Sequence, residues 1–591
     1  NPNHFPILGH TGGIFPLLNS NALGNSDFAN GAMAAHYGNV YSGVMDMNLR
    51  KGNNHRHEFM GQVGIFGAEF MAEGPFKKDK GSYLVVARGG IFSLLQALNV
   101  DIGTNAVPQY YDLNFKLDFP TKGGGSWSVF GVGGYARVDL LNDNVDTSDI
   151  FTVRNNNAYF RNYSALMGIR NLHYFNETTS LKTTFSGVLQ HYLQDRDTIM
   201  GDRSALNYQG RLKYDRYGVQ SVLNKKFSNK LLTRVGLQSF MYIYDTYRLR
   251  VREDRFTVYA VENQFMGSLF GEMQYRFSEK LDVTLGVHAY YWSINDRNWA
   301  VEPRFAINWN LHPRHHLSFG YGWHSKAQSA DLLYTLDQQP DGTYTNVNRA
   351  LGPTRSHHLV LTYDWSISKF LAFKFNAYTN YNYDIAIDQV PSSFAMMNYE
   401  AGASQRIQAN LVNGGQQLNY GAEASLERFF GQGFYGLLSA SYQRSFYRAS
   451  DEIIRSSAYD IRFIGSLLAG KEFKIGRQKR NAIYGDLRFN SREGAPTTPI
   501  DLEASRTRGG TVFVEDQAFS ERLGWYNRLD VRIGMRFNHP TRRISHHIYI
   551  EVLNVTQARN DLTVLYYPRL NRTVKAKQFG LFPNFLYQVR F

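Results

Sequence analysis

Alternation of apolar and polar residues over long stretches constrains this chain more than any other feature. In YDLNFKLDF, residues 111–119, every odd position is apolar or aromatic and every even position is Asp, Asn or Lys. The same period of two runs through residues 281–289, 371–381 and 528–537. Because successive side chains of a strand point to opposite faces, each stretch predicts a strand with one apolar and one polar face.

These stretches are longer than the strands of ordinary soluble sheets. They run over about 10 to 20 residues, against about 5 to 6 in soluble proteins, and hairpins follow one another without helical segments. We count about 22 strands, enough for a large closed barrel. They are predicted to begin near residues 57, 67, 81, 110, 126, 159, 180, 208, 231, 260, 281, 301, 315, 356, 370, 416, 433, 459, 481, 525, 545 and 584.

The connections between these strands alternate between short and long. Membrane barrels have short periplasmic turns and long outer loops, so the alternation predicts which end of the barrel faces each side. The tight turns lie near residues 74–80, 120–125, 175–179, 227–230, 278–280, 311–314, 366–369, 431–433, 474–480 and 538–543. The long connections lie near 93–109, 139–158, 194–207, 249–259, 325–355, 385–415, 447–458, 493–524 and 559–583, with short outer exceptions at 65–68 and 296–300.

Composition excludes a membrane-spanning helix. The 591 residues have a mean hydropathy of −0.39 and contain no run of about 18 apolar residues. A chain that crosses a membrane without such helices must form a closed barrel, because backbone groups in hydrocarbon need internal partners. The sequence has no Cys, which fits an oxidising envelope compartment.

Positive charge is concentrated in the tight turns and the strand ends beside them. The formal net charge is +14 at pH 7, and these positions hold 17 basic residues against four acidic ones. This predicts a basic periplasmic rim that lies against phospholipid phosphates. A nucleic-acid interface is disfavoured because the charge is scattered over ten turns. The basic residues are Lys77, Lys78, Lys80, Lys122, Lys225, Lys226, Lys230, Lys280, Arg314, Lys369, Lys471, Lys474, Arg477, Lys479, Arg480, Arg542 and Arg543; the acidic ones are Asp79, Glu177, Glu279 and Glu472.

The last seven residues, FLYQVRF, predict a strand that ends the chain and closes the barrel. Phe585, Tyr587, Val589 and Phe591 fall on one face, and the polar residues between them fall on the other. A soluble edge strand is the alternative for such a segment. The ending resembles the sorting signal of bacterial outer-membrane barrels, which implies recognition by the barrel-assembly machinery.

Several segments together resemble one family of outer-membrane proteins. AAHYGNVYSGVMDMNLRKGN, residues 34–53, looks like the closing segment of the plug domain of TonB-dependent receptors, and NPNHFP at the start resembles a mid-plug segment of their Bacteroidota branch. The resemblance continues through EGPF at 73–76, VEPRFAINW at 301–309, YNRLDVRIG at 526–534 and PNFLYQVRF at the end. It implies an all-β transmembrane antiparallel barrel of about 22 strands, residues 53–591, with a partial plug domain, residues 1–52, in the lumen.

The resemblance implies active uptake of a scarce ligand across the bacterial outer membrane. Siderophores, cofactors, peptides and glycans remain open as ligand classes. The implied partners are outer-membrane lipid and lipopolysaccharide and a TonB-type energy-coupling complex, with a surface lipoprotein or other outer-membrane subunits left open. No signal peptide is visible at Asn1, and the family's coupling box and first plug strands are not found in this sequence. We expect them upstream in the intact protein; a passive pore and a scaffold subunit of a larger complex are the alternatives.

Candidate ligand contacts are limited to aromatic and basic residues of the outer loops. They lie either in a vestibule that uses stacking and cation–π contacts or in an aromatic belt at the membrane interface. The sequence has none of the enzyme motifs that we sought, and adjacent His residues on a strand face opposite ways. We therefore expect no catalytic residue, metal or cofactor. The ligand candidates are Tyr244, Tyr247, Arg248, Arg250, Trp299, Trp323, His324, Arg506 and Arg508.

Overall fold

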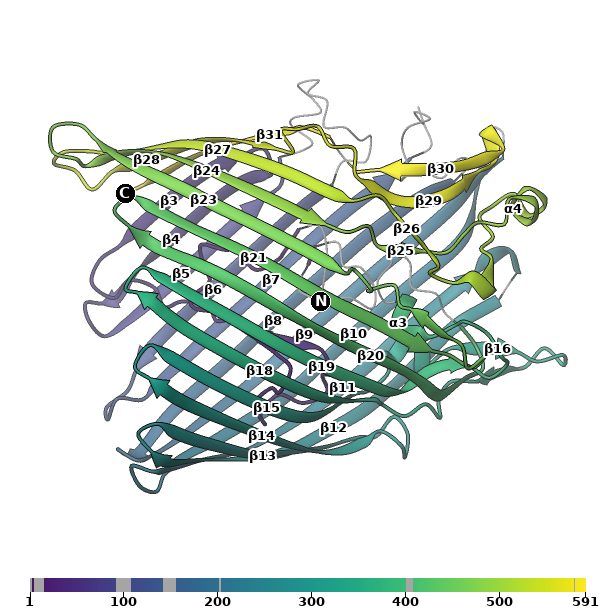
Figure 1. Cartoon of the computed structure of the whole chain (residues 1–591), viewed down its shortest axis with the longest axis horizontal. Helices are drawn as coiled ribbons and strands as arrows, with labels where there is room; N and C mark the ends of the chain where they lie inside the picture. The colour runs from purple at the N-terminus through teal and green to yellow at the C-terminus, as the bar shows by residue number, and fades with distance from the viewer. Residues whose placement is uncertain are drawn as a thin grey trace.

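The strands of the chain form one closed antiparallel barrel (Figure 1). The computed structural model describes residues 3–4, 15–91, 108–141, 156–200, 203–253, 255–399, 408–578 and 580–591. In these residues 22 strands make up the wall, and the short β22 (Ile454–Ser456) extends the outer end of one of them. The all-β barrel expected from the alternation is therefore confirmed.

The wall strands begin within a few residues of the predicted positions. They are β3 (Glu58–Gly64), β4 (Gly67–Lys77), β5 (Gly81–Gly89), β6 (Gln109–Pro120), β7 (Ser126–Leu140), β8 (Asn156–Asn176), β9 (Thr179–Met200), β10 (Arg203–Lys226), β11 (Leu231–Arg250), β12 (Arg255–Ser278), β13 (Leu281–Trp292), β14 (Trp299–His312), β15 (His315–Lys326), β18 (Thr354–Ser368), β19 (Leu371–Asp388), β20 (Leu411–Gly431), β21 (Phe434–Arg448), β23 (Phe463–Ile475), β24 (Asn481–Arg492), β27 (Tyr526–Asn538), β28 (Ser545–Leu553) and β31 (Phe582–Arg590).

The last strand closes the barrel against the first. β31 pairs with β28 along its whole length and with β3 from Met60 to Gly64. Phe585 and Phe591 are 44% and 53% exposed, whereas the side-chain amide of Gln588 donates to Gln62 at 2.8 Å. The structure therefore places these apolar side chains on the outer face, while their role as an assembly signal, with Tyr587 and Val589, stays a prediction.

The two ends of the barrel differ as the connections predicted. All ten tight turns lie at the end that carries the C terminus, on the left of Figure 1, and the long connections lie at the other end. The long connections contain short elements of their own: α2 (Ala330–Leu333), β16 (Leu336–Gln338), β17 (Tyr344–Asn346), α3 (Met396–Tyr399), β25 (Pro496–Thr497), α4 (Leu502–Arg508), β26 (Glu521–Arg522), β29 (Asp561–Tyr567), β30 (Arg572–Lys577), and the 3-10 turns η1 (Val251–Glu253), η2 (Glu515–Gln517) and η3 (Pro568–Leu570).

Two predicted outer connections are wrong because the strands continue through them. Residues 194–200 and 203–207 are strand, and β11 and β12 extend over most of 249–259. Ion pairs cross between these strands on their outward face, with Arg211 2.7 Å from Asp195 and Lys213 2.8 Å from Asp245. Polar side chains on both faces hide the alternation, so the sequence resembles a loop there. The connections predicted at 93–109 and 139–158 lie largely outside the described residues.

The described residues before β3 form no part of the barrel sheet. Residues 15–57, the lumen segment, contain a separate hairpin of β1 (Asp27–Asn30) and β2 (Gly43–Asp46). Their side chains and backbone contact inward-facing residues of strands from β4 to β18. No helix of the described chain is long and apolar enough to cross a membrane.

Candidate functional site

The lumen segment is bound to one sector of the wall through buried amides. Asn114 of β6 is fully buried; its side-chain amide donates to the carbonyl of Leu17 at 2.9 Å, and its carbonyl oxygen accepts from the backbone N–H of Asn19 at 3.2 Å. The carboxylate of Glu69 accepts from the side chains of Asn19 and Asn21 at 2.8 and 2.7 Å. Because buried polar groups need partners, this sector of the lumen requires the segment.

A second sector holds the backbone of residues 33–36. The carboxylate of Glu272 accepts from a backbone N–H at 3.1 Å, and the imidazole of His288 donates to a carbonyl at 2.9 Å. Gln238 and Arg304 donate to further carbonyls, at 3.1 and 3.2 Å. Four strands, β11 to β14, therefore hold one short stretch of chain.

Small residues let the backbone of the segment approach the wall in this second sector. A Cβ at Gly320 would lie 2.7 Å from the Cβ of Ala32, and a Cβ at Gly286 would lie 2.9 Å from that of Ala35. Both distances are shorter than real contacts, so only Gly fits opposite these alanines. The segment and the wall are matched in shape as well as in hydrogen bonds.

The end of the lumen segment is attached to β4. Glu73 is 4% exposed and accepts from both terminal nitrogens of Arg50 at 2.7 Å, and from the backbone N–H of Asn53 at 2.8 Å. Such a bidentate charged pair is among the stronger polar contacts in proteins. It fixes the point at which the segment leaves the lumen and enters the barrel wall.

At the outer end, two long connections pack against the inner side of several strands. Residues 327–353, with α2, and residues 389–399, with α3, form an apolar core against the ends of β11 to β14. Within it, Arg248 lies 2.6 Å from Asp331, and both side chains are less than 10% exposed. Packed side chains therefore cover the part of the mouth that lies beside these strands.

A small cavity remains between the lumen segment and this packed mouth. It has a volume of about 70 Å³, enough for one or two water molecules. The ammonium group of Lys326 lies 5.4 Å from the ring centroid of Tyr41, a cation–π contact. The lining residues are Tyr41, Lys326, Ala327, Gln328, Ser329, Thr354, Ile385, Ala386, Met396 and Met397.

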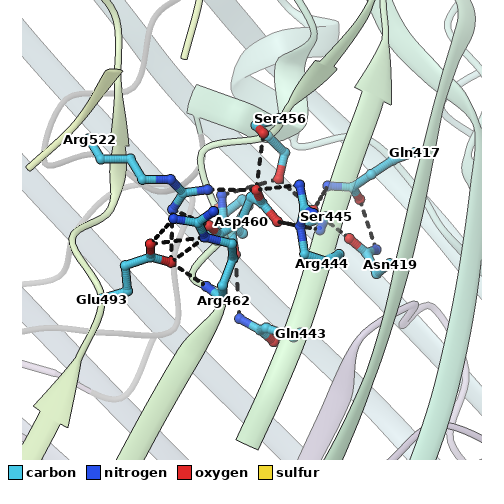
Figure 2. Close-up of polar contacts among 12 residues, drawn as sticks. Gln417, Asn419, Gln443, Arg444, Ser445, Ser456, Asp460, Arg462, Glu493 and Arg522 are labelled. Carbon is cyan, nitrogen blue, oxygen red and sulfur yellow. Dashed lines mark hydrogen bonds and ion pairs between the residues drawn. The ribbon is translucent and has the colours of Figure 1, made fainter. Parts of the chain in front are cut away.

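A charged network fixes two further outer connections to the rim, as Figure 2 shows. Asp460 is fully buried and accepts from Arg444 at 3.1 Å and from Arg522 at 2.7 Å. Glu493 accepts from Arg462 at 2.9 Å and lies 3.4 Å from Arg522. Arg522 thus bridges two carboxylates, and the network joins residues 449–462 to residues 493–525.

The carboxylates of this network are held in the charged state. Burial alone would raise the pKa of Asp460, but hydrogen bonds from Arg444, Ser445 and Ser456 outweigh it and lower that pKa. The hydrogen bonds from Arg462, and the charge of Arg522, lower the pKa of Glu493 despite partial burial. The loops at this rim therefore depend on ionised carboxylates.

The predicted ligand contacts do not gather in one place. Tyr244, Arg248 and His324 face the lumen and are 4%, 6% and 0% exposed. The first two belong to the packed part of the mouth, with the ring of Tyr244 5.4 Å from that of Tyr334. His324 packs deeper, with its ring 4.8 Å from that of His358.

The remaining candidates lie on the outside of the barrel or on its loops. Trp299 is 54% exposed on the outward face, and Trp323 stacks on His357 at 6.0 Å on the same face, positions that favour the belt interpretation. The other four are dispersed: Tyr247 donates to Gln209, Arg250 lies 3.5 Å from Glu253, Arg506 donates to Asn571, and Arg508 is exposed on α4. Ligand contact by any of the nine stays a prediction.

Sequence reasoning missed the residues that line the cavity. Tyr41 lies in a Gly-rich stretch, and Met396 and Met397 lie in a long connection. One signal was available: FAMMNY, residues 394–399, is an apolar run inside an otherwise polar loop, and such a run needs cover. Among the described residues, no group of three or more His, Asp or Glu side chains is arranged to hold a metal ion.

A closed barrel with short turns at one end, folded loops at the other and its lumen occupied by a segment of its own chain defines the class of plugged outer-membrane barrels. The family model described as TonB-dependent receptor-like, β-barrel, matches residues 88–555. The chain belongs to this family and is a bacterial outer-membrane protein. Members of the family work with a TonB-type energy-coupling complex.

Solved structures with the same fold are receptors and transporters. FpvA of Pseudomonas aeruginosa PAO1, a pyoverdine receptor, is 12% identical with a TM-score of 0.68, covering 96% of this chain and 83% of its own. BauA of Acinetobacter baumannii, the ferric preacinetobactin receptor, is 12% identical with a TM-score of 0.67, covering 98% and 86%. Fiu of E. coli K12, a ferric-catecholate import receptor, is 9% identical with a TM-score of 0.65, covering 95% and 85%. A comparison with curated proteins gives no match.

Proposed function

We propose that the protein imports a scarce ligand through its barrel by displacing the lumen segment. The observation that carries this proposal is the double attachment of the segment to the wall through reversible polar contacts at Glu69 and Asn114 and at residues 33–36. Hydrogen bonds and small-residue contacts hold a plug in place yet break one at a time under load. We take residues 1–52 as the C-terminal part of a plug domain, and a TonB-type complex as the partner that pulls on it. No enzymatic reaction is part of this proposal.

The cavity beside Tyr41 is our candidate for the inner part of the ligand site. Lys326 supplies a positive charge, and Met396 and Met397 supply adaptable apolar surface. This chemistry suits a ligand with both an electronegative group and an apolar or aromatic part. Ferric siderophores combine these properties and are bound by several proteins of the same fold, so they are the first class to test. Opening the mouth would enlarge the cavity to the size of such a ligand.

The test is growth promotion in an iron-starved outer-membrane host that lacks its own siderophore receptors. Cells carrying the protein should grow on at least one catecholate, hydroxamate or mixed ferric siderophore, and the same cells without the TonB complex should not. Lys326→Gln should raise the concentration needed for half-maximal growth, whereas Lys213→Gln, on the outer face of the barrel, should not. Growth without the TonB complex would indicate a passive pore, and growth on none of the compounds would exclude siderophores.

A scaffold role is the second candidate, favoured by the packed mouth. The cavity beside the apolar core of α2 and α3 has a volume of about 70 Å³, far less than that of a site that holds a siderophore. A barrel that serves as a subunit has no need to open. Purification from outer membranes under mild detergent distinguishes the two: partners such as a surface lipoprotein in fixed stoichiometry, together with no TonB-dependent uptake, would support the scaffold.

A further inference from the structure

Cations on the outward face of the barrel have different partners at its two ends. At the outer end they pair with carboxylates, as Arg211 does with Asp195 and Lys213 does with Asp245. At the end with the tight turns, β20 and β23 each carry an outward-facing cation, Arg428 and Lys471, that lies beside aromatic rings. This difference in partners is the basis of the inference.

Strand parity places Arg428 and Lys471 on the outward face. Along β20 the exposed apolar residues up to the bulge are even-numbered, namely Val412, Leu418, Tyr420 and Leu426, and Arg428 shares their parity. The exposed Phe429 and Phe430 lie in the register shift between Arg428 and Gly431. Lys471 pairs in register with Phe434, whose ring is 44% exposed. Both cations lie within a few residues of a tight turn, so they lie at the membrane interface of that end.

Aromatic rings surround both charges. The ammonium group of Lys471 lies 3.4 Å from the ring centroid of Phe434 and 5.2 Å from that of Phe473. The guanidinium of Arg428 lies 6.0 Å from the ring of Phe370. These rings orient the cations without neutralising them.

The nearest carboxylates of these strand ends are turned away. Glu427 and Glu472 have the opposite strand parity to the two cations, and Glu472 lies 3.6 Å from Arg536. In the part of the chain that the structure describes, neither Arg428 nor Lys471 pairs with a carboxylate. Their charge is therefore available to a ligand that lies in the lipid.

A glycine, Gly436, lies on the strand between the two cations. Arg428 is in register with Gly436, which is in register with Ala469, two residues from Lys471. The spacing and rise of β-strands place the two positions about 12 Å apart, so the long side chains can converge on one group above Gly436. A glycine there leaves room for that group.

We propose that Arg428 and Lys471 bind the phosphate of an anionic phospholipid of the inner leaflet. The tight-turn end faces the periplasm, so the lipid that reaches it is phospholipid. The phosphate takes charge-assisted hydrogen bonds from both cations. The exposed rings of Phe430, Phe434 and Phe473 border the acyl chains.

Native mass spectrometry of the detergent-purified protein tests this site. Phosphatidylglycerol should bind more tightly than phosphatidylcholine. The Arg428→Gln/Lys471→Gln variant should lose about 30-fold in affinity for phosphatidylglycerol, because each cation near an anionic lipid contributes about 1 kcal/mol to binding. Arg428→Lys/Lys471→Arg keeps both charges and should retain binding. The matched control, Arg211→Gln/Lys213→Gln, removes two outward cations at the other end and should bind as the wild type does.

Three results would overturn the proposal: equal affinity for the two lipids, equal loss in the control variant, or lipopolysaccharide competing as well as phosphatidylglycerol. Glycerol phosphate, which has the phosphate but no acyl chain, should compete at least tenfold more weakly; equal competition would mean a free-phosphate site. Heat-modifiable migration on gels checks that each variant remains a folded barrel.

Discussion

The two ends of the barrel reach order by different physical routes. At the tight-turn end, the connections are held by local backbone geometry: residues 432 and 433 both have positive φ, 55° and 78°, as a two-residue hairpin turn requires. At the outer end, order comes from contacts far apart in sequence, such as that between Arg522 and Asp460. The order of the tight turns is therefore encoded by neighbouring residues, whereas the order of the outer loops is not. Substitutions should therefore act locally at one end and across several loops at the other.

The largest effect is expected from Asp460→Ala at the outer end. It removes the fully buried carboxylate that joins Arg444 and Arg522 and leaves both guanidinium groups without that partner. Breaking a buried ion pair from one side costs about 3 to 5 kcal/mol. Hydrogen exchange should rise in both residues 449–462 and residues 493–525, while the tight turns stay protected.

Asp460→Asn is the matched control, since it keeps the shape and part of the hydrogen bonding and should give a smaller increase in exchange. If loosening after Asp460→Ala were confined to 449–462, Arg522 would not couple the two connections. The outer end would then depend less on contacts between residues far apart in sequence, and it would differ less from the tight-turn end.

A smaller but sharply localised effect is expected from Gly433→Ala at the tight-turn end. The left-handed conformation alone costs a residue with a Cβ about 1 to 2 kcal/mol, and that Cβ would lie 2.4 Å from the carbonyl oxygen of Glu472. Unfolding of the barrel by urea in vesicles should occur at lower denaturant concentration.

Gly509→Ala at the outer end is the comparison for this turn. Gly509 also has a positive φ, 70°, at the C-cap of α4, but a Cβ there would meet nothing within 4 Å. Gly509→Ala should lower stability less than Gly433→Ala does, and it should not alter the unfolding of the barrel by urea. Equal effects would show that strain alone, and not the approach of the neighbouring strand, decides the cost at Gly433.

This difference between the ends explains what the sequence could predict. Strand number, the tight turns and the outward face of Phe585 and Phe591 follow from alternation and turn chemistry, which are local. The packing at the mouth does not, because Arg248 and Asp331 are 83 residues apart and no local sequence feature of either residue indicates the other. The outer ends of the long strands were not predicted for the opposite reason. The alternation is local there, but polar pairs on the outward face, such as Arg211 and Asp195, replace the apolar residues that would reveal it.

Acid should loosen the outer end before the tight-turn end. The pKa values of Asp460 and Glu493 are lower in the folded protein than in the unfolded chain, where they are about 4. Their contribution to stability is therefore fully present above about pH 4 and is lost as the pH falls through the folded values. Proteolysis of intact cells or vesicles by an acid-active protease should cut residues 449–462 and 493–525 faster at pH 3 than at pH 5.

The acid effect has an internal control in Asp460→Asn. This variant lacks the carboxylate that titrates, so its cleavage should depend less on pH than that of the wild type. The ten tight turns hold few carboxylates and should show no new cleavage over the same range. Cleavage at the turns first would place the acid-sensitive contacts at the wrong end.

The smallest effect is expected from single charge removals in the basic rim, such as Lys122→Gln. Lys122 is exposed in the turn between β6 and β7, and surface substitutions of this kind change stability by less than about 0.5 kcal/mol. The contribution of Lys122 to membrane binding comes from the summed field of many rim cations acting on anionic lipid.

In phosphatidylcholine vesicles Lys122→Gln should unfold as the wild type does. In vesicles rich in phosphatidylglycerol, removal of several rim lysines together should lower the stability of the barrel, and added salt should erase the difference. A loss that is equal in both lipids would mean that these lysines stabilise the turns themselves, and the two ends would then differ less than their sequences indicate.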